Sequence, residues 1–454
     1  MTQLTTPRTS TDRLVMPVVA VGVLLSGFDL FIVNVALGDI ARAVGVTSLA
    51  DLSWVLNAYT IAFAALLVPA GRLGDHFGSK RVFLAGLALF VLASALCATS
   101  PSLGALVGFR VGQAVGAALM IPSSLGVVLA ATPPERRAGA VHLWAGLGGL
   151  GAALGPVVGG LLVHADWRWV FLINIPTGLI AIAVGLRVLP ETPRHADARP
   201  GLGSALLLVV SVAALVGGLV NGSEWGWTSA GTLSAFAVAA AGIAATALSV
   251  VRGERPIVDL ALLRVPHFAP MSVYLLVFHV AFGAMLLSVI LWQQDVWRFS
   301  ALESGLGVAP GPLLVPLVAS RAGRLAARLG AHRVLTLGSL VFAAGVASWA
   351  VLVDPTSTYA GSLLPGMLLT GLGVGLCVPT AMAVGSSQLP PSRFSTGSAV
   401  LSTARQVGIA LGVAALVAVL QGHSGSGGFA PGWWLIAAAA TLAGLTTLSR
   451  REVA

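Results

Sequence analysis

Long apolar runs separated by short loops fill most of this sequence. A helix needs about 20 largely apolar residues to cross a bilayer. By that rule we expect fourteen membrane-crossing helices, near residues 15–37, 53–70, 82–99, 103–131, 141–163, 169–189, 202–221, 230–251, 267–291, 303–321, 334–353, 359–384, 397–420 and 431–449. The chain is 57% hydrophobic and 9% charged, whereas a soluble domain carries about 25% charged residues. We therefore expect an all-α membrane protein, because no soluble fold buries so much apolar surface.

One short basic loop occurs twice, each time between two apolar runs. Residues 71–82 (GRLGDHFGSKRV) return as 323–334 (GRLAARLGAHRV), with six of the twelve positions identical and an offset of 252 residues. The first run begins near 15 and the ninth near 267, which is the same offset. An internal repeat of this kind indicates duplication. We expect six-plus-six helix bundles with a two-helix insertion between them.

The repeat also divides the chain. We predict a cytoplasmic tail at 1–14, an N-terminal six-helix bundle at 15–190, a linker with the inserted hairpin at 191–266, a C-terminal six-helix bundle at 267–449 and a second tail at 450–454. The polar first segment holds no apolar core, so we expect a tail there rather than a signal peptide.

Arginine and lysine indicate the orientation in the membrane. If both termini are cytoplasmic, the outer loops hold only Arg42, Arg168 and Arg298 of the 25 positive side chains, and Arg110 and Arg405 lie within runs. All others fall on the inner side, as the positive-inside rule requires. Both termini are therefore predicted to be cytoplasmic, and the net charge of +9 reflects topology rather than nucleic-acid binding.

The first copy of the loop carries chemistry that the second copy lacks. Gly71 and Gly78 allow close approach of helix ends. Asp75, which is replaced by alanine in the second copy, can pair with Arg81 or Arg136 or cap a helix N-terminus. Such contacts latch one conformation and release another, so we predict cytoplasmic gating here. A loop that serves topology alone is the alternative.

Two charged residues lie deep inside predicted helices. Asp29 is the only carboxylate well within a run, and Arg110 lies within the fourth. At about 1.5 Å per residue, both are roughly 10–12 Å below the outer surface. A charge there costs about 2.5–3.5 kcal/mol on insertion scales, so a functional role is the first hypothesis. The alternatives are a structural acid and an arginine bonded to backbone carbonyls.

Proton coupling is the role that this pair suggests. A buried aspartate beside an arginine stays ionised, and once the pairing weakens, burial favours the protonated form. Uptake of a proton from outside and its release inside would be worth about 2.3 kcal/mol per 100 mV. That energy supports roughly fifty-fold accumulation of a substrate.

Several further motifs resemble those of one family. They are DLFIVNVAL at 29–37, LVGFRVGQAVG at 106–116, GAALGPVVGG at 151–160 and WRWVFLINIPTG at 167–178, together with the loop at 71–82. Over essentially its whole length, the chain resembles the fourteen-span drug:proton antiporters of the major facilitator superfamily. It departs from their first-span motif at Gly38, where the family usually has proline.

The resemblance implies that residues 151–160 form the antiporter motif, with Gly151, Gly155, Pro156, Gly159 and Gly160. Independently of the family, glycines spaced by four residues permit close packing of two helices in lipid. A proline inside a helix removes a backbone hydrogen bond and bends it. We predict a hinge or seal between the halves, with ordinary small-residue packing as the alternative.

Polar and aromatic residues on helix faces suggest a substrate cavity. Candidates are Asn34, Trp54, Asn57, Gln113 and, from the other half, His279, which as a lone histidine is alternatively a core residue. Arg405 and Gln406 are assigned to helix packing near the cytoplasmic side.

Together these features predict a secondary transporter rather than an enzyme. We expect proton-coupled export of amphipathic small molecules (drugs, antibiotics or a self-made metabolite) by a monomer in a bacterial plasma membrane. With one deep carboxylate, the substrate is expected to be neutral, zwitterionic or singly charged rather than a dication. Uptake of a nutrient and a non-transporting receptor are the alternatives. The sequence holds no G-x-x-x-x-G-K-[ST] nucleotide motif, and we expect no cofactor or metal.

Overall fold

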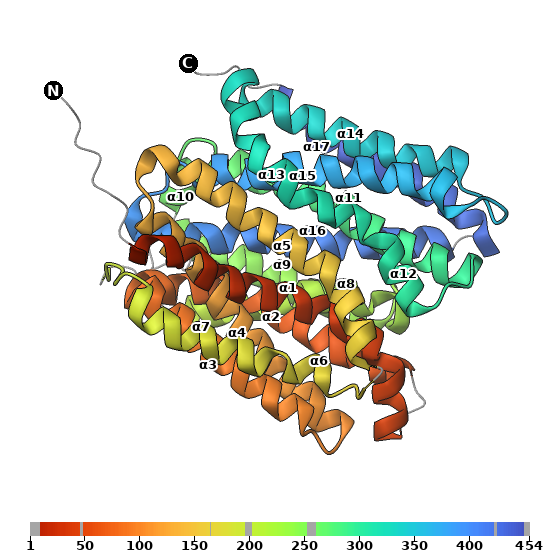
Figure 1. The fold of residues 1–454 in the computed structure, drawn as a ribbon, viewed down its shortest axis with the longest axis horizontal. Helices are drawn as coiled ribbons and strands as arrows, with labels where there is room; N and C mark the ends of the chain where they lie inside the picture. The colour runs from red at the N-terminus through yellow and green to blue at the C-terminus, as the bar shows by residue number, and fades with distance from the viewer. Residues whose placement is uncertain are drawn as a thin grey trace.

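The structure is a computed structural model that describes residues 10–45, 49–163, 165–195, 202–251, 260–421 and 425–448. Within these ranges every regular element is helical (Figure 1). The helices run nearly side by side along the long axis of the molecule. Asn34 and Pro156 lie within helices, but their side chains are outside the described part. Of the predicted tails at 1–14 and 450–454, residues 1–9 and 450–454 are outside it, whereas residues 10–14 already belong to the first helix.

The first half contains seven helical elements, which are α1 (Ser10–Val44), α2 (Leu49–Phe77), α3 (Ser79–Ala98), α4 (Leu103–Ala131), α5 (Pro134–Val163), α6 (Trp169–Leu172) and α7 (Asn174–Val188). Local signals set several ends. The Ser102 hydroxyl caps α4 by accepting a hydrogen bond from Ala105 N (3.3 Å), and Gly78 adopts φ +94° between α2 and α3. Glycine adopts that left-handed conformation without steric cost.

The second half repeats this order after α8 (Leu202–Trp225) and α9 (Ala230–Val251). Its elements are α10 (Leu260–Arg264), α11 (Phe268–Leu291), η2 (Trp292–Val296), α12 (Ala301–Val308), α13 (Pro310–Leu329), α14 (Ala331–Leu352), η3 (Tyr359–Leu363), α15 (Leu364–Ser386), η4 (Pro391–Arg393), α16 (Phe394–Gln421), η5 (Gly425–Gly428) and α17 (Phe429–Leu448). Equivalent helices pack alike: α1 contacts α5 as α11 contacts α16, and α3 contacts α4 as α14 contacts α15.

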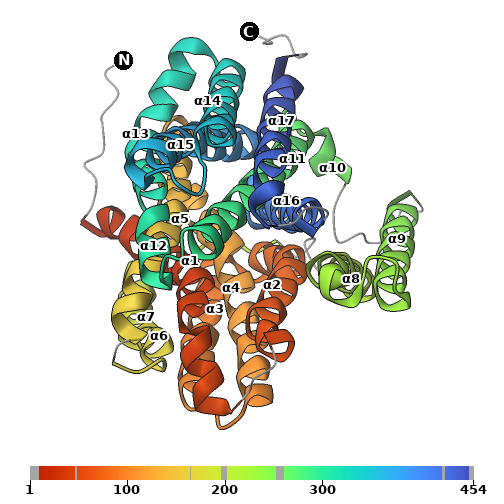
Figure 2. The ribbon, with the colours of Figure 1, turned by 90° about the vertical axis from the view of Figure 1, so that its right-hand side faces the viewer.

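The halves meet along two seams, one between α2 and α16 and the other between α5 and α13. Figure 2 shows the two bundles one above the other, with α8 and α9 at the side. Helix α8 packs against both α2 and α16. The inserted hairpin therefore covers the α2–α16 seam but not the α5–α13 seam.

The outer surface fits a lipid environment. Within the described residues, eleven helical segments are long and apolar enough to cross a membrane, and the shorter apolar helices Leu14–Asp29 and Ala230–Thr246 accompany them. Large apolar side chains face outward, among them Leu161, Ile180, Leu206 and Val351, which are 65–72% exposed. The predicted all-α membrane fold is confirmed, whereas the count of fourteen spans stays a prediction.

Candidate functional site

A carboxylate and a guanidinium group meet inside the N-terminal bundle. Asp29 of α1 forms an ion pair with Arg110 of α4, and neither side chain is exposed. Gln113 joins them: its Oε1 accepts from Arg110 Nη1 (2.8 Å), and its Nε2 donates to Asp29 Oδ1 (3.2 Å). Arg110 Nε also donates to the carbonyl of Val55 in α2 (3.1 Å). Charges in a low-dielectric interior need such partners, because each buried ion costs several kcal/mol. Among the described residues, only the Nη2 atom of this guanidinium group has no hydrogen-bond partner.

Aromatic and polar neighbours complete this cluster. The Arg110 guanidinium lies over the Tyr59 ring, 4.3 Å from its centroid, a cation–π contact. Ser94 of α3 accepts hydrogen bonds from Gln113 Nε2 (2.8 Å) and Asn174 Nδ2 (3.2 Å). We name Asp29, Arg110, Gln113, Tyr59 and Ser94 the carboxylate cluster. It joins α1, α2, α3 and α4, so a shift of one helix changes the surroundings of Asp29.

A cavity of about 160 Å³ lies between the two halves. Its wall comes from α1, α2, α4 and α5 of the first half and from α11, α13, α15 and α16 of the second: Val23, Ser26, Gly27, Phe63, Ile121, Trp144, Ala145, Gly148, His279, Phe282, Val315, Val374, Val378, Ser402, Arg405, Gln406 and Ile409. Apolar and aromatic groups dominate, with a few polar side chains among them, as in most small-molecule sites.

The carboxylate cluster is one helical turn from this cavity by two routes. Ser26 lines the cavity and precedes Asp29 by three residues on α1. Phe63 also lines it, and its ring stacks on Tyr59 with centroids 5.9 Å apart. A change in the occupant of the cavity can therefore reach Asp29 through short contacts.

The structure places His279 on the cavity wall and corrects the assignment of Arg405 and Gln406. Arg405 Nε donates to His279 Nε2 (3.1 Å), and His279 Nδ1 bonds the Leu275 carbonyl (2.7 Å). Both Arg405 and Gln406 line the cavity rather than serving helix packing alone. The sequence could not show this, because helical periodicity defines a face of α16 without naming what that face meets.

Three other cavity candidates do not line it. Asn57 contacts Ser53 (3.3 Å) and, in the inserted hairpin, Asn221 Oδ1 (3.4 Å). Trp54 is also absent from the wall, and Gln113 belongs to the carboxylate cluster. The polar face of α2 thus turns toward α8, which the prediction did not consider as a neighbour. The side chain of Asn34 is outside the described part.

At one end of the α2–α16 seam, Asp75 caps a helix of the other half. Its carboxylate accepts from Ser395 N (2.9 Å), Thr396 N (2.9 Å) and the Thr396 hydroxyl (2.5 Å), in the first turn of α16. The first turn of a helix carries free N–H groups and partial positive charge, so a buried carboxylate is well placed there. We call this contact the Asp75 cap.

Close backbone approach supports the cap. A Cβ atom added at Gly71 would lie 2.6 Å from the Ser395 carbonyl oxygen, and one at Gly74 would lie 2.8 Å from the Ser395 hydroxyl. The Ser79 and Ser395 hydroxyls are 3.0 Å apart. Only glycine fits at these two positions of α2.

Arg81 and Arg136 do not pair with Asp75, so that alternative is wrong. Arg81, with 54% of its side chain exposed, lies near Glu191 (3.7 Å), which also pairs with Lys80 (3.1 Å). Arg136 is exposed at the start of α5, and the next residue, Arg137, lies over the Phe394 ring instead, 5.0 Å from its centroid. Lys80 lowers the pKa of Glu191 through a hydrogen bond and its charge.

The glycines of residues 151–160 bring α5 against neighbours on two sides. A Cβ at Gly151 would lie 3.1 Å from Gly27 Cα, and one at Gly159 would meet Ile32, also of α1. Gly160 instead faces Leu302 of α12, in the other half. Gly155 is buried, and the side chain of Pro156 is outside the described part. The hinge role stays a prediction.

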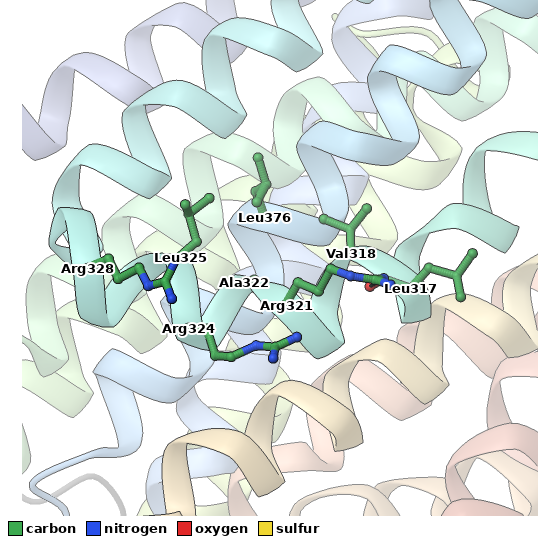
Figure 3. A pocket seen from close by; sticks show the side chains of 8 residues that line it. All are labelled: Leu317, Val318, Arg321, Ala322, Arg324, Leu325, Arg328 and Leu376. Atoms are coloured by element: carbon green, nitrogen blue, oxygen red, sulfur yellow. Dashed lines mark hydrogen bonds between the residues drawn. The ribbon is translucent and has the colours of Figure 1, made fainter.

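A larger hollow, of about 470 Å³, lies away from the carboxylate cluster. It follows α13 and includes Arg321, Arg324 and Arg328, with Leu376 of α15 at its other side (Figure 3). All three arginines are exposed. Because no deep polar group faces it, we take the cavity between the halves as the candidate site.

Comparison with known proteins agrees with this architecture of two similar helix bundles around a central cavity. The sequence profile of the Major Facilitator Superfamily matches residues 19–413. The chain is 33% identical to the tetracenomycin C resistance and export protein of Streptomyces glaucescens over 411 residues, which cover 90% of this chain and 76% of that one. It is 31% identical to the methylenomycin A resistance protein of Streptomyces coelicolor over 407 residues, covering 89% and 85%.

Solved structures show the same fold. The crystal structure of the human organic anion transporter MFSD10 superposes with a TM-score of 0.70 at 16% identity and covers 97% of this chain and all of that one. At that identity the likeness concerns the fold alone. The fold and its cavity define a multi-pass membrane transporter. The chain belongs to the Major Facilitator Superfamily.

Proposed function

We propose that this transporter exports amphipathic small molecules (drugs, antibiotics or a metabolite of the same cell) in exchange for protons. The observation that carries the proposal is the carboxylate cluster, one helical turn from the cavity between the halves. The printed names of the relatives, which concern resistance and export, support the outward direction.

Asp29 is the proposed proton carrier. In the described arrangement Arg110 and Gln113 both donate hydrogen bonds to its carboxylate. A shift of α1 against α4 would separate the charges and leave a buried carboxylate without its cation. Protonation then removes the charge at less cost than exposure to the apolar interior.

In alternating access, the cavity would open first at one end of the seams and then at the other. The Asp75 cap closes the cytoplasmic end of the α2–α16 seam, so opening toward the cytoplasm requires its release. We propose that the carboxylate cluster and the cap belong to one cycle. Loading of the cavity from the cytoplasm needs the cap open, and discharge to the outside needs it closed.

A complete cavity within one chain supports a monomer as the working unit. Both halves of the same chain line it. We place the protein in the plasma membrane of a bacterial cell, with both termini cytoplasmic, on the distribution of arginine and lysine.

The test is transport by inside-out vesicles from an efflux-deficient bacterial host. An acid-interior pH gradient should drive accumulation of dyes and antibiotics from a screen, and a protonophore should abolish it. Vesicles without the protein are the control. Accumulation that survives the protonophore would refute proton coupling, and uptake by whole cells instead of extrusion would reverse the direction.

A further inference from the structure

The wall of the central cavity carries positive charge without a carboxylate to balance it. Arg405 is the only charged side chain among the lining residues, and His279 is the only other titratable one. Among the described residues, Arg405 takes part in none of the ion pairs. The other arginine deep in the membrane, Arg110, forms an ion pair with Asp29. This contrast requires an explanation, because an unpaired charge at this depth is costly.

The contacts of Arg405 fix the orientation of its guanidinium group. Its Nε donates to His279 Nε2 (3.1 Å), which can accept only while unprotonated, and His279 Nδ1 donates to the Leu275 carbonyl (2.7 Å). Histidine thus fixes the orientation of Arg405 and stays neutral. Both terminal amino groups of Arg405 lack an acceptor among the described residues. Their planar arrangement matches the two oxygens of a carboxylate.

Further polar groups lie beside Arg405. Ser402 precedes it by one turn of α16, lines the cavity, and has a buried hydroxyl with no hydrogen-bond partner among the described residues. Gln406 follows it on the same wall, and Ser26 lines the cavity from α1. An unpartnered buried hydroxyl in a cavity is a group that a ligand can satisfy.

The rest of the wall suits the apolar part of a ligand. Phe63, Trp144 and Phe282 contribute aromatic surface from α2, α5 and α11. The volume of about 160 Å³ is below the roughly 300–1,000 Å³ of most ligand pockets. In this conformation the cavity accommodates an acid group and a small ring system, and larger molecules need it to open.

We propose that the central cavity binds amphipathic organic anions, with Arg405 pairing the acid group and His279 positioning Arg405. This inference rests on the proposed export function and assigns its substrate class. It narrows the expectation from sequence, which allowed neutral, zwitterionic and singly charged molecules alike. The same arginine disfavours a dication by charge repulsion.

The test separates binding from transport. The purified full-length protein in detergent is titrated with 2-naphthoate, 2-naphthamide and 2-naphthylmethylammonium, which share the ring system and differ in charge, and the change in tryptophan fluorescence is measured. We expect the carboxylate to bind at least about tenfold more tightly than the other two, the size of one charge-assisted contact.

Variants assign that preference to a residue. Arg405→Gln should remove the preference for the carboxylate while leaving amide binding within about twofold, and Arg405→Lys should keep part of it. His279→Gln should weaken carboxylate binding less than Arg405→Gln does. The control Arg321→Gln removes an exposed arginine outside the cavity and should change nothing. Equal loss of all three probes in Arg405→Gln, or preference for the ammonium, would overturn the assignment.

Failure of the proposed function gives a different result. If carboxylate binding depends on Arg405 but energised vesicles accumulate none of the probes and no screened drug, the site stands and the export proposal falls. If vesicles accumulate drugs without any dependence on Arg405 or on anionic charge, export stands and this inference falls.

Discussion

The two copies of the short loop, residues 71–82 and 323–334, make different contacts in the folded protein. In the first, Asp75 is 3% exposed and caps α16 across the seam. In the second, the equivalent Ala327 is exposed at the end of α13, beside the exposed arginines of the hollow in Figure 3. Both copies keep a turn glycine in the left-handed region, Gly78 at φ +94° and Gly330 at φ +88°. The backbone of the turn has therefore been retained, and the contact between halves exists in one copy only.

The same division holds inside the membrane. Asp29 aligns with Ala281 at the repeat offset of 252 residues, and Gly27 aligns with His279. The first half thus carries the buried acids, and the second carries the unpaired cation of the cavity. Duplication gave the two halves the same helix packing, and a few substitutions have given them different chemistry. Substitutions in each half can break or sharpen this division.

The largest effect is expected from Asp29→Asn. The amide keeps the size of the side chain but cannot carry a proton, and it replaces one of the two acceptor oxygens with a donor. Uphill export should therefore fall to the level of vesicles without the protein. Because the change leaves Arg110 buried without its counter-ion, the thermal midpoint should also fall, so transport is compared at equal amounts of folded protein. The matched control is Asp39→Asn, the same change on α1 at a half-exposed acid that pairs with Arg42. Uphill export by Asp29→Asn would place the proton carrier elsewhere.

The next effect concerns the Asp75 cap. Asp75→Ala makes the first loop resemble the second and leaves Ser395 N and Thr396 N without their acceptor. Loss of charge-assisted bonds of this kind costs about 2–3 kcal/mol, which shifts the equilibrium toward opening of this end of the α2–α16 seam by at least about tenfold. A cysteine at buried Ala399, which faces Gly71 across the seam, reports the opening by its rate of thiol labelling.

The background and controls for that experiment are favourable. The natural cysteines, Cys97 and Cys377, are both fully buried. Glu135→Ala removes an exposed acid on the same side of the membrane, and Ala327→Asp adds one at an exposed position. Neither should alter the labelling rate. An unchanged rate in Asp75→Ala would show that the cap does not hold the seam closed.

Much of the architecture was predictable from sequence, and the contacts across seams were not. Length and apolarity identify helices, because each must satisfy its own backbone in lipid, and equal depth brought Asp29 and Arg110 together. The partner of Asp75 lies 320 residues further along the chain. The start of α16 after Pro390 and Pro391, followed by Ser395 and Thr396, is a helix-start signal, yet it does not reveal which carboxylate caps it.

A third prediction compares equivalent glycines. Gly71→Ala would place Cβ 2.6 Å from the Ser395 carbonyl oxygen, so α2 and α16 must separate, at a cost of about 1–2 kcal/mol, toward the lower end of what overpacking costs. Gly323→Ala meets nothing closer than His142 Nδ1 at 3.5 Å, an ordinary contact. Thermal unfolding of the two purified variants is the measurement. Only Gly71→Ala should lower the midpoint, and equal midpoints would remove the claimed difference between the seams.

The smallest effect is expected from Glu191→Gln, which removes the acid that pairs with Lys80 and Arg81 beside the first loop. Glu191 is exposed, and exposed ion pairs contribute little, so transport should stay within about twofold of the unchanged protein. Lys80 lowers the pKa of Glu191, which means that the pair stabilises the folded state above the ordinary glutamate pKa and is lost only as the pH falls through the lowered value. Transport rates measured at neutral and at mildly acidic pH should therefore show the same small ratio between variant and unchanged protein. A large loss of transport in Glu191→Gln would mean that this exposed ion pair holds the first loop together with the Asp75 cap. In the second copy of the loop, Ala331, His332 and Arg333 occupy the positions of Ser79, Lys80 and Arg81. The two copies would then differ by two contacts instead of one.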